Sequence, residues 1–276
     1  MEETQARRAV AAARSTARGL GLEVADTVVI YNSDRIAVRL IPCDVLARVA
    51  PQPCQDEFRF EAAVARRLAE TGSPVGALEP LAGSRVYVED GFALTLWRYY
   101  EPMGAIAPAD YAEALIQLHN GLRQLDLAAP HISERITAWV AELENPEQNP
   151  DLAHADREFL STALHRIRSA IGQPNAADQL LHGEPHPGNL LSTSSGPRFI
   201  DFHTCQRGPV EYDIAFLPEE AAARYPGVNQ AMVQQFRALM WAGFTTMRWR
   251  ARDQFPDRDL WRAEGFNRLR AALERA

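Results

Sequence analysis

The residues that decide the fold lie between positions 180 and 202. Residues 180–189 read L-L-H-G-E-P-H-P-G-N, and residues 199–202 read F-I-D-F. Glu184 precedes Asn189 by five residues, and Asp201 follows Asn189 by twelve. These three side chains offer a carboxylate, a carboxamide oxygen and a second carboxylate, which together form a set of hard oxygen donors. Such a set is typical of a Mg²⁺ ion held together with the phosphates of a substrate.

The histidines at positions 182 and 186 also allow a zinc interpretation. A helical H-E-x-x-H site needs glutamate directly after the first histidine, and the prolines at 185 and 187 exclude the helix it requires. The H-x-E spacing of zinc deaminases fits residues 182–184, but its P-C-x-x-C partner is missing from the sequence. The sequence therefore disfavours a zinc hydrolase.

Upstream of this stretch, the sequence alternates between strand and turn patterns. The apolar periodicity of residues 58–68 predicts one helix, ended by Gly72 and Pro74. β-branched and alternating segments between turn residues predict an antiparallel meander. The predicted strands are 27–31, 36–41, 45–49, 85–88 and 92–97, with turns at 32–34, 42–44 and 89–91.

After residue 98 the character of the sequence changes to mainly helical. Helices are predicted over 111–125, 135–143 and 157–171 and from 230 to the end, with a break near 255–256. This segregation predicts an α+β protein with two lobes. Residues 1–98 would form a small antiparallel sheet with one helix, and residues 99–276 a larger, mainly helical lobe. Arginines among alanines at the N-terminus predict a short surface helix.

Composition excludes several function classes. The 276 residues carry a net charge of −7, and all 29 basic residues are arginine. Without lysine, a Schiff base or a phosphate-loop lysine is excluded. The acidic balance disfavours a nucleic-acid partner, and no apolar run reaches the roughly 18 residues of a membrane span. Three cysteines without a disulfide pattern favour a cytoplasmic protein. No pattern indicates an oligomeric state.

The ordered motifs resemble those of the aminoglycoside phosphotransferases and their relatives, the choline and homoserine kinases. The family's H-G-D-x-x-x-x-N loop matches residues 182–189, its I-D-F matches 200–202, and its G-P-x-x-x-D-L-A resembles 208–215. The resemblance implies a protein-kinase-like two-lobe fold. It also implies transfer of phosphate from ATP (or GTP), with Mg²⁺, to a hydroxyl of a small molecule. An aminoglycoside-like antibiotic is one candidate acceptor.

The resemblance also implies roles for individual residues of the helical lobe. Glu184 would orient the acceptor hydroxyl and take its proton, while Asn189 and Asp201 would hold Mg²⁺. His182 and Asp213 would support the catalytic loop, and His186 and His203 are candidates for lining the substrate site.

In the smaller lobe, the resemblance places nucleotide-binding residues on the third strand, the helix and the hinge. Arg48 stands where kinases have a strand-three lysine, and Glu61 where they have its helix glutamate. Trp97 and Tyr99 would lie in the hinge that contacts the base. Arginine at 48, and glutamate instead of aspartate at 184, depart from the family pattern. The alternative function is therefore a non-catalytic protein of the same fold that binds nucleotides or small molecules.

Overall fold

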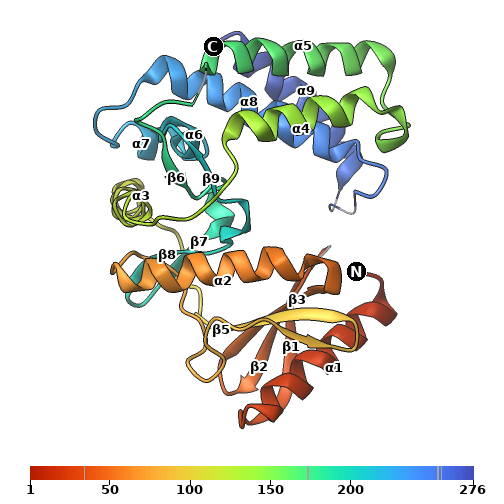
Figure 1. The fold of residues 1–276 in the computed structure, drawn as a ribbon, viewed down its shortest axis with the longest axis vertical. Helices are drawn as coiled ribbons and strands as arrows, with labels where there is room; N and C mark the ends of the chain where they lie inside the picture. The colour runs from red at the N-terminus through yellow and green to blue at the C-terminus, as the bar shows by residue number, and fades with distance from the viewer. Residues whose placement is uncertain (34, 173, 254, 256) are drawn as a thin grey trace. The chain divides into compact units, whose positions relative to one another are not determined.

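The computed structural model describes residues 1–33, 35–172, 174–253, 255 and 257–276 as a mixed α+β protein (Figure 1). The contacts within the chain divide it into two compact units. The first unit contains residues 1–125 and 188–204, and the second contains residues 126–187 and 205–276. This grouping differs from the predicted lobes 1–98 and 99–276, because residues 99–125 and the segment 188–204 pack within the first unit.

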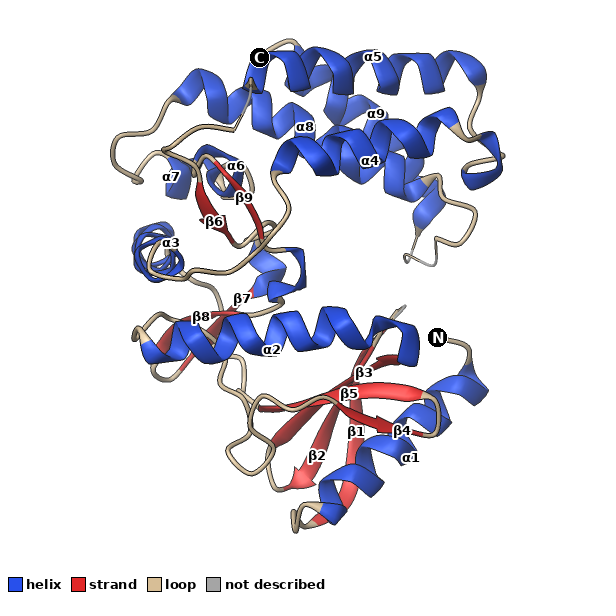
Figure 2. Cartoon of the chain, viewed as in Figure 1, coloured by secondary structure: helices blue, strands red, loops and turns tan. Residues whose placement is uncertain are grey.

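A five-stranded antiparallel sheet forms the centre of the first unit (Figure 2). Its strand order is β1-β2-β3-β5-β4. All five predicted strands are present, with modest shifts of their ends. At the turn between the last two, Asp90 and Gly91 have φ of 50° and 78°, the conformation that a two-residue hairpin requires. The bounds are β1 (Val24–Asn32), β2 (Ile36–Pro42), β3 (Val45–Pro51), β4 (Tyr87–Glu89) and β5 (Phe92–Arg98). Asp34 of the predicted 32–34 turn lies outside the described residues.

Two helices cover opposite faces of this sheet. Helix α1 (Glu3–Gly19) buries its alanines in one cluster with residues such as Val38 and Leu94. The predicted N-terminal surface helix is present, but it is 17 residues long and its small side chains let one face pack closely on the strands. Helix α2 (Gln55–Glu70) places Phe58 against Ala50 and Ala93 on the other face. Successive residues of a strand point to opposite faces of the sheet. Each helix therefore packs against every second residue of the strands.

The rest of the first unit consists of α3 (Pro108–Leu122) and the hairpin of β7 (Leu190–Thr193) and β8 (Gly196–Phe199). Phe199 packs its ring 6.2 Å from that of Tyr111 on α3. Its backbone also forms a bridge with Val75, which follows α2. These contacts attach the hairpin, and the residues that follow it, to the sheet unit.

The second unit combines a helical bundle with a two-stranded antiparallel sheet, β6 (Gln179–Leu181) and β9 (Gln206–Gly208). The predicted helices are present, and α8 and α9 are separated around Phe255; Pro256 lies outside the described residues. The helices are α4 (Ile132–Glu144), α5 (His154–Ile171), α6 (Glu211–Ile214), α7 (Glu219–Ala222), α8 (Gln230–Arg248) and α9 (Arg258–Leu273). Within the described ranges, no helix is long and apolar enough to cross a membrane.

The contact between α4 and α8 depends on a glycine. A Cβ at Gly243 of α8 would lie 2.4 Å from the ring of Trp139 on α4, which is 5% exposed. We expect Gly243→Ala to lower the free energy of unfolding by about 1–3 kcal/mol, because overpacking a rigid ring outweighs the gain in helix propensity. Urea denaturation measures the change. Gly19→Ala, where a Cβ meets no atom within 4 Å, is the control and should not destabilise the chain. Equal stabilities for the two variants would contradict tight packing at Gly243.

Candidate functional site

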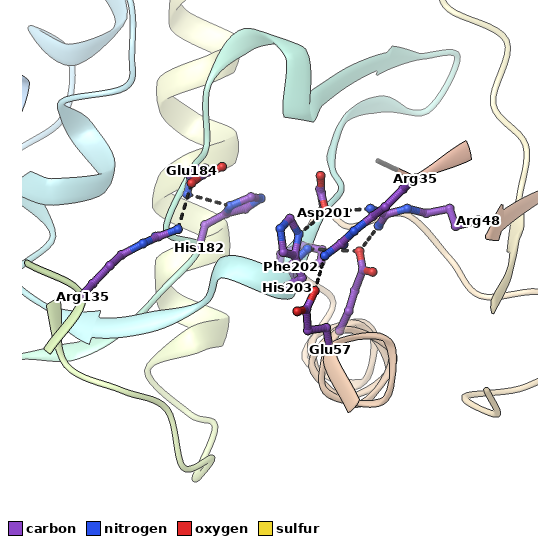
Figure 3. A network of polar contacts seen from close by, with 10 residues as sticks. Arg35, Arg48, Glu57, Arg135, His182, Glu184, Asp201, Phe202 and His203 are labelled. Carbon is purple, nitrogen blue, oxygen red and sulfur yellow. Dashed lines mark hydrogen bonds and ion pairs between the residues drawn. The ribbon is translucent and has the colours of Figure 1, made fainter. Parts of the chain in front are cut away.

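In the first unit, Arg48 connects two carboxylates that come from distant parts of the sequence (Figure 3). Its neighbours Ala47 and Val49 pack towards α1, so the Arg48 side chain points to the other face of the sheet. One guanidinium nitrogen, Nη1, contacts the Glu61 carboxylate of α2. The other, Nη2, donates a 2.8 Å hydrogen bond to Oδ1 of Asp201, just beyond β8. The two terminal nitrogens of the planar guanidinium thus bind two different carboxylates.

Burial and charge act against each other in this bridge. Burial alone lowers the pKa of the Arg48 guanidinium, but the charges of Glu61 and Asp201 outweigh it and raise this pKa above its ordinary value. Burial raises the pKa of Glu61, which is fully buried, against the opposing charge of Arg48. Burial also disfavours the Asp201 carboxylate, yet Arg48 and His203 hold the pKa of Asp201 well below its ordinary value. Asp201 is therefore an ionised carboxylate.

Asn189 and Asp201 lie on adjoining segments, because β7, which follows Asn189, pairs with β8, which precedes Asp201. The β7–β8 register places Leu190 opposite Phe199, and the backbone N–H of Ile200 donates to the Asn189 carbonyl at 3.0 Å. Asp201 itself adopts a left-handed conformation with φ of 70°. An ionised carboxylate and a carboxamide on adjoining segments are hard oxygen donors, so these two residues fit a Mg²⁺ ion.

The remaining predicted residue of this segment, His203, lies beside Asp201. Its Nδ1 contacts Oδ1 of the Asp201 carboxylate. The backbone N–H of Phe202 donates to Oε1 of Glu61 at 3.3 Å, which ties the segment to α2. His203 therefore contacts Asp201, the residue predicted to hold Mg²⁺. The sequence indicated His203 as a candidate for lining the substrate site, and this substrate-lining role stays a prediction.

Of the two predicted hinge residues, Trp97 is buried and Tyr99 is half-buried. Trp97 is 6% exposed, and its indole N–H donates to the Thr95 hydroxyl at 2.9 Å. The backbone N–H of Tyr99 donates to the Asp44 carbonyl at 2.9 Å. The guanidinium of Arg39 lies over the Tyr99 ring, 4.0 Å from its centre. Trp97 thus acts through packing in this structure, and Tyr99 presents one face of its ring to a cation.

In the second unit, the loop that carries Glu184 is fixed through its backbone. The N–H groups of His182 and Gly183 donate to the two oxygens of Asp213, at 2.8 and 2.9 Å. The N–H of Glu184 donates to Nδ1 of His182 at 3.3 Å, and that of His186 to the Glu184 carbonyl at 2.8 Å. Gly183 has φ of 94°, a conformation that glycine adopts without strain. His182 and Asp213 therefore lie where a loop-supporting role would place them.

Sequence reasoning missed the residue that contacts the Glu184 side chain. Nη2 of Arg135, in the first turn of α4, donates to Oε1 of Glu184 at 3.0 Å (Figure 3). Burial lowers the pKa of this guanidinium, but Tyr212 and Glu184 outweigh burial and raise it. Burial in turn raises the pKa of the Tyr212 phenol to about 12. The two partners of the ion pair are 49 residues apart in the sequence, and no motif joins them.

The described part of the chain contains no cluster of side chains that could bind zinc. Nowhere among residues 1–33, 35–172, 174–253, 255 and 257–276 do three histidine, cysteine, aspartate or glutamate side chains come together as metal ligands. Instead, the ring nitrogen Nδ1 of His182 accepts a hydrogen bond from the backbone N–H of Glu184 in the same loop.

Comparisons with known proteins show the family of this chain. Residues 31–250 match the sequence profile of a family described as "Phosphotransferase enzyme family". A segment of 79 residues, 28% of the chain, is 32% identical to the N-acetylmuramate/N-acetylglucosamine kinase of Pseudomonas aeruginosa strain PAO1. That match spans 22% of the length of the curated relative.

Solved structures share the fold over almost the whole chain. A thermostable mutant of an aminoglycoside phosphotransferase in its apo form superposes with a TM-score of 0.72 and 12% identity, covering 95% of this chain and 98% of that one. The GDP complex of an aminoglycoside 2′-phosphotransferase gives 0.68 and 16%, with 96% and 98% covered.

Proposed function

We propose that this chain, which belongs to the phosphotransferase enzyme family, transfers the terminal phosphoryl group of ATP or GTP to a hydroxyl of a small molecule. The observation that carries the proposal is the bridge from Arg48 to Glu61 and Asp201. It gathers a strand cation, a helix carboxylate and an ionised carboxylate within one compact unit. Phosphoryl transfer depends on such positioning and charge neutralisation more than on covalent chemistry.

The residues of the first unit would bind the nucleotide. Asp201 and Asn189 would hold Mg²⁺ through their oxygens. Bound Mg²⁺ neutralises charge on the phosphate oxygens during transfer. Arg48 keeps Asp201 ionised and fixed in direction. Its guanidinium would also lie beside the phosphates and help to position the nucleotide. Glu61 holds Arg48 in place from the opposite side.

In the second unit, Glu184 would act on the acceptor. Its carboxylate would accept a hydrogen bond from the acceptor hydroxyl and then take the proton as the oxygen attacks phosphorus. Asp213 holds the backbone of this loop. The bond that forms is between the acceptor oxygen and phosphorus, and the bond that breaks releases the nucleoside diphosphate.

Amino sugars are the acceptor class that we propose first. The relatives that share about a quarter of this chain are kinases named for N-acetylmuramate and N-acetylglucosamine. Solved structures with a similar fold include aminoglycoside phosphotransferases, and one of these enzymes was solved in complex with GDP and kanamycin. These molecules share ring hydroxyls next to amino or acetamido groups, whereas choline, which is not a sugar, provides a contrast.

The test is a phosphotransfer assay on the purified chain with Mg²⁺ and either ATP or GTP. N-acetylmuramate, N-acetylglucosamine, kanamycin and choline serve as acceptors. We expect turnover with an amino sugar, detected as nucleoside diphosphate and as phosphorylated acceptor by mass spectrometry. Turnover with none of the acceptors would contradict the proposal, and calorimetry then separates the alternatives. A non-catalytic binding protein would still bind Mg²⁺-nucleotide.

Asp201 provides an independent check of the nucleotide site. We expect Asp201→Asn to weaken the affinity for Mg²⁺-ATP about tenfold or more, because the ionised oxygen donor is lost. Asp213→Asn is unsuitable as a control because Asp213 holds the loop of Glu184. Asp126→Asn, at an exposed aspartate of the second unit, should bind Mg²⁺-ATP like the wild type in calorimetry. Unchanged affinity of the Asp201 variant would show that Asp201 does not hold the metal.

A further inference from the structure

We propose that Arg135 is a positioning residue that fixes the direction of the Glu184 carboxylate for proton acceptance. The inference rests on the proposed function, since it assigns a task to Arg135 within that reaction. The contact itself is a hydrogen-bonded ion pair, 3.0 Å from Nη2 of Arg135 to Oε1 of Glu184. Both side chains are about three-quarters shielded from solvent, with 22% and 26% exposed. Such shielding strengthens an ion pair relative to an exposed one.

The backbone of Arg135 is fixed relative to the Glu184 loop. His131 caps the N-terminus of α4, and its Nε2 contacts Oδ2 of Asp178 at 3.1 Å, one residue before β6. The backbone of His131 also forms a bridge with Arg207 of β9. The loop of Glu184 continues directly from β6. The first turn of α4 and this loop are therefore attached to the same small sheet, which sets the place from which Arg135 reaches Glu184.

The guanidinium is also held on its other sides. It lies over the ring of Trp139, 5.4 Å from the ring centre. The nearby Tyr212 phenol contributes to the raised pKa of this guanidinium. Tyr212 is 1% exposed and packs edge-on against Phe216 and Phe236. A guanidinium that lies over one ring and is paired with Glu184 loses conformational freedom, so the carboxylate that it binds is restrained as well.

The need for this restraint follows from the length of the glutamate side chain. Glutamate has one more rotatable bond than the aspartate of the family loop, and Asp213 restrains only the backbone of this loop. A displacement of about 1 Å in a catalytic group can lower a rate about a hundredfold. Arg135 therefore fixes the additional torsion that glutamate brings, and the two residues act as a pair.

A double-mutant cycle with Arg135→Met and Glu184→Asp tests the pair. Aspartate shortens the side chain by about 1.5 Å, one C–C bond, and withdraws the carboxylate from Arg135. The assay uses Mg²⁺ with ATP or GTP, with water as the acceptor and with any amino sugar that the wild type phosphorylates. We expect Arg135→Met to lower kcat about tenfold or more in the wild-type background, with the nucleotide KM within about twofold. In the Glu184→Asp background it should change kcat less than about twofold.

Two further variants separate positioning from a general structural role. Arg135→Lys keeps a charge and a donor and should recover part of the lost kcat. Arg166→Met, at an exposed arginine of α5, should behave like the wild type. An equal loss of kcat in both backgrounds would show that Arg135 is only structural and would overturn the inference, as would an unchanged kcat for Arg135→Met. If the wild type shows no turnover of any kind, the proposed function itself fails and the inference with it.

Discussion

Replacing Arg48 with methionine is expected to lower the free energy of unfolding by about 3–5 kcal/mol, because it leaves the buried Glu61 carboxylate without its cation. Glu61 is fully buried, and Arg48 is the nearest opposing charge on it. Burial already raises the pKa of Glu61, and loss of Arg48 raises this pKa further. Protonation of Glu61 removes the buried charge. The loss in the free energy of unfolding caused by Arg48→Met should therefore become smaller as pH falls and larger as pH rises. Urea denaturation at several pH values measures it.

A second substitution isolates the cause of this effect. In the Glu61→Leu background, Arg48→Met removes both partners, and much of the lost stability should return. Arg59→Met serves as the matched control, because Arg59 lies on the exposed side of α2 with its side chain 61% exposed. If Arg48→Met were as stable as the Arg59 variant, Arg48 would not compensate a buried charge.

Replacing Glu184 with glutamine is expected to lower kcat about 10²–10⁴-fold, because the amide cannot take the proton of the acceptor hydroxyl. The affinity for Mg²⁺-nucleotide should stay unchanged, since the residues proposed to bind the nucleotide are Arg48, Asn189 and Asp201. Steady-state kinetics with saturating acceptor gives kcat, and calorimetry gives the nucleotide affinity. The two measurements together distinguish a lost base from a damaged fold.

The control for this prediction is Glu220→Gln, at an exposed glutamate of α7. It removes the same charge from the same unit and should leave kcat near the wild-type value. A Glu184→Gln variant with full activity would eliminate Glu184 as the base. The geometry of the nucleotide site would then have to support transfer through another acceptor of the proton.

The sequence was informative wherever the signal is local. Alternation of apolar residues defined the five strands, and the 89–91 turn of β4 and β5 follows from the two residues Asp90 and Gly91. The loop of Glu184 and the segment of Asp201 were found because their residues lie within a short, ordered stretch. Strand pairing between residues 190 and 199 then brings the backbone of Asn189 opposite Ile200, one residue before Asp201.

Contacts over long sequence distances could not be predicted in the same way. Arg48 and Asp201 are 153 residues apart, and the sequence indicated phosphates and Glu61 as the partners of Arg48 but gave no sign of Asp201. Arg135 lies in an ordinary amphipathic helix, where nothing in the periodicity separates a positioning arginine from a solvated one. The packing of α1 was missed because alanines among arginines are also typical of an exposed helix.

The arginine at position 48 has a consequence for covalent labelling. Nucleotide analogues with an acyl phosphate modify kinases by acylating an amine beside the phosphates. Arg48 presents a guanidinium whose pKa is raised further by its two carboxylates, so it stays protonated and unreactive towards such reagents. Arg48→Lys would introduce the only lysine side chain into a sequence that has none. A nucleotide-directed acylating reagent should then label that variant at one side chain, and the labelled peptide would map the phosphate end of the nucleotide.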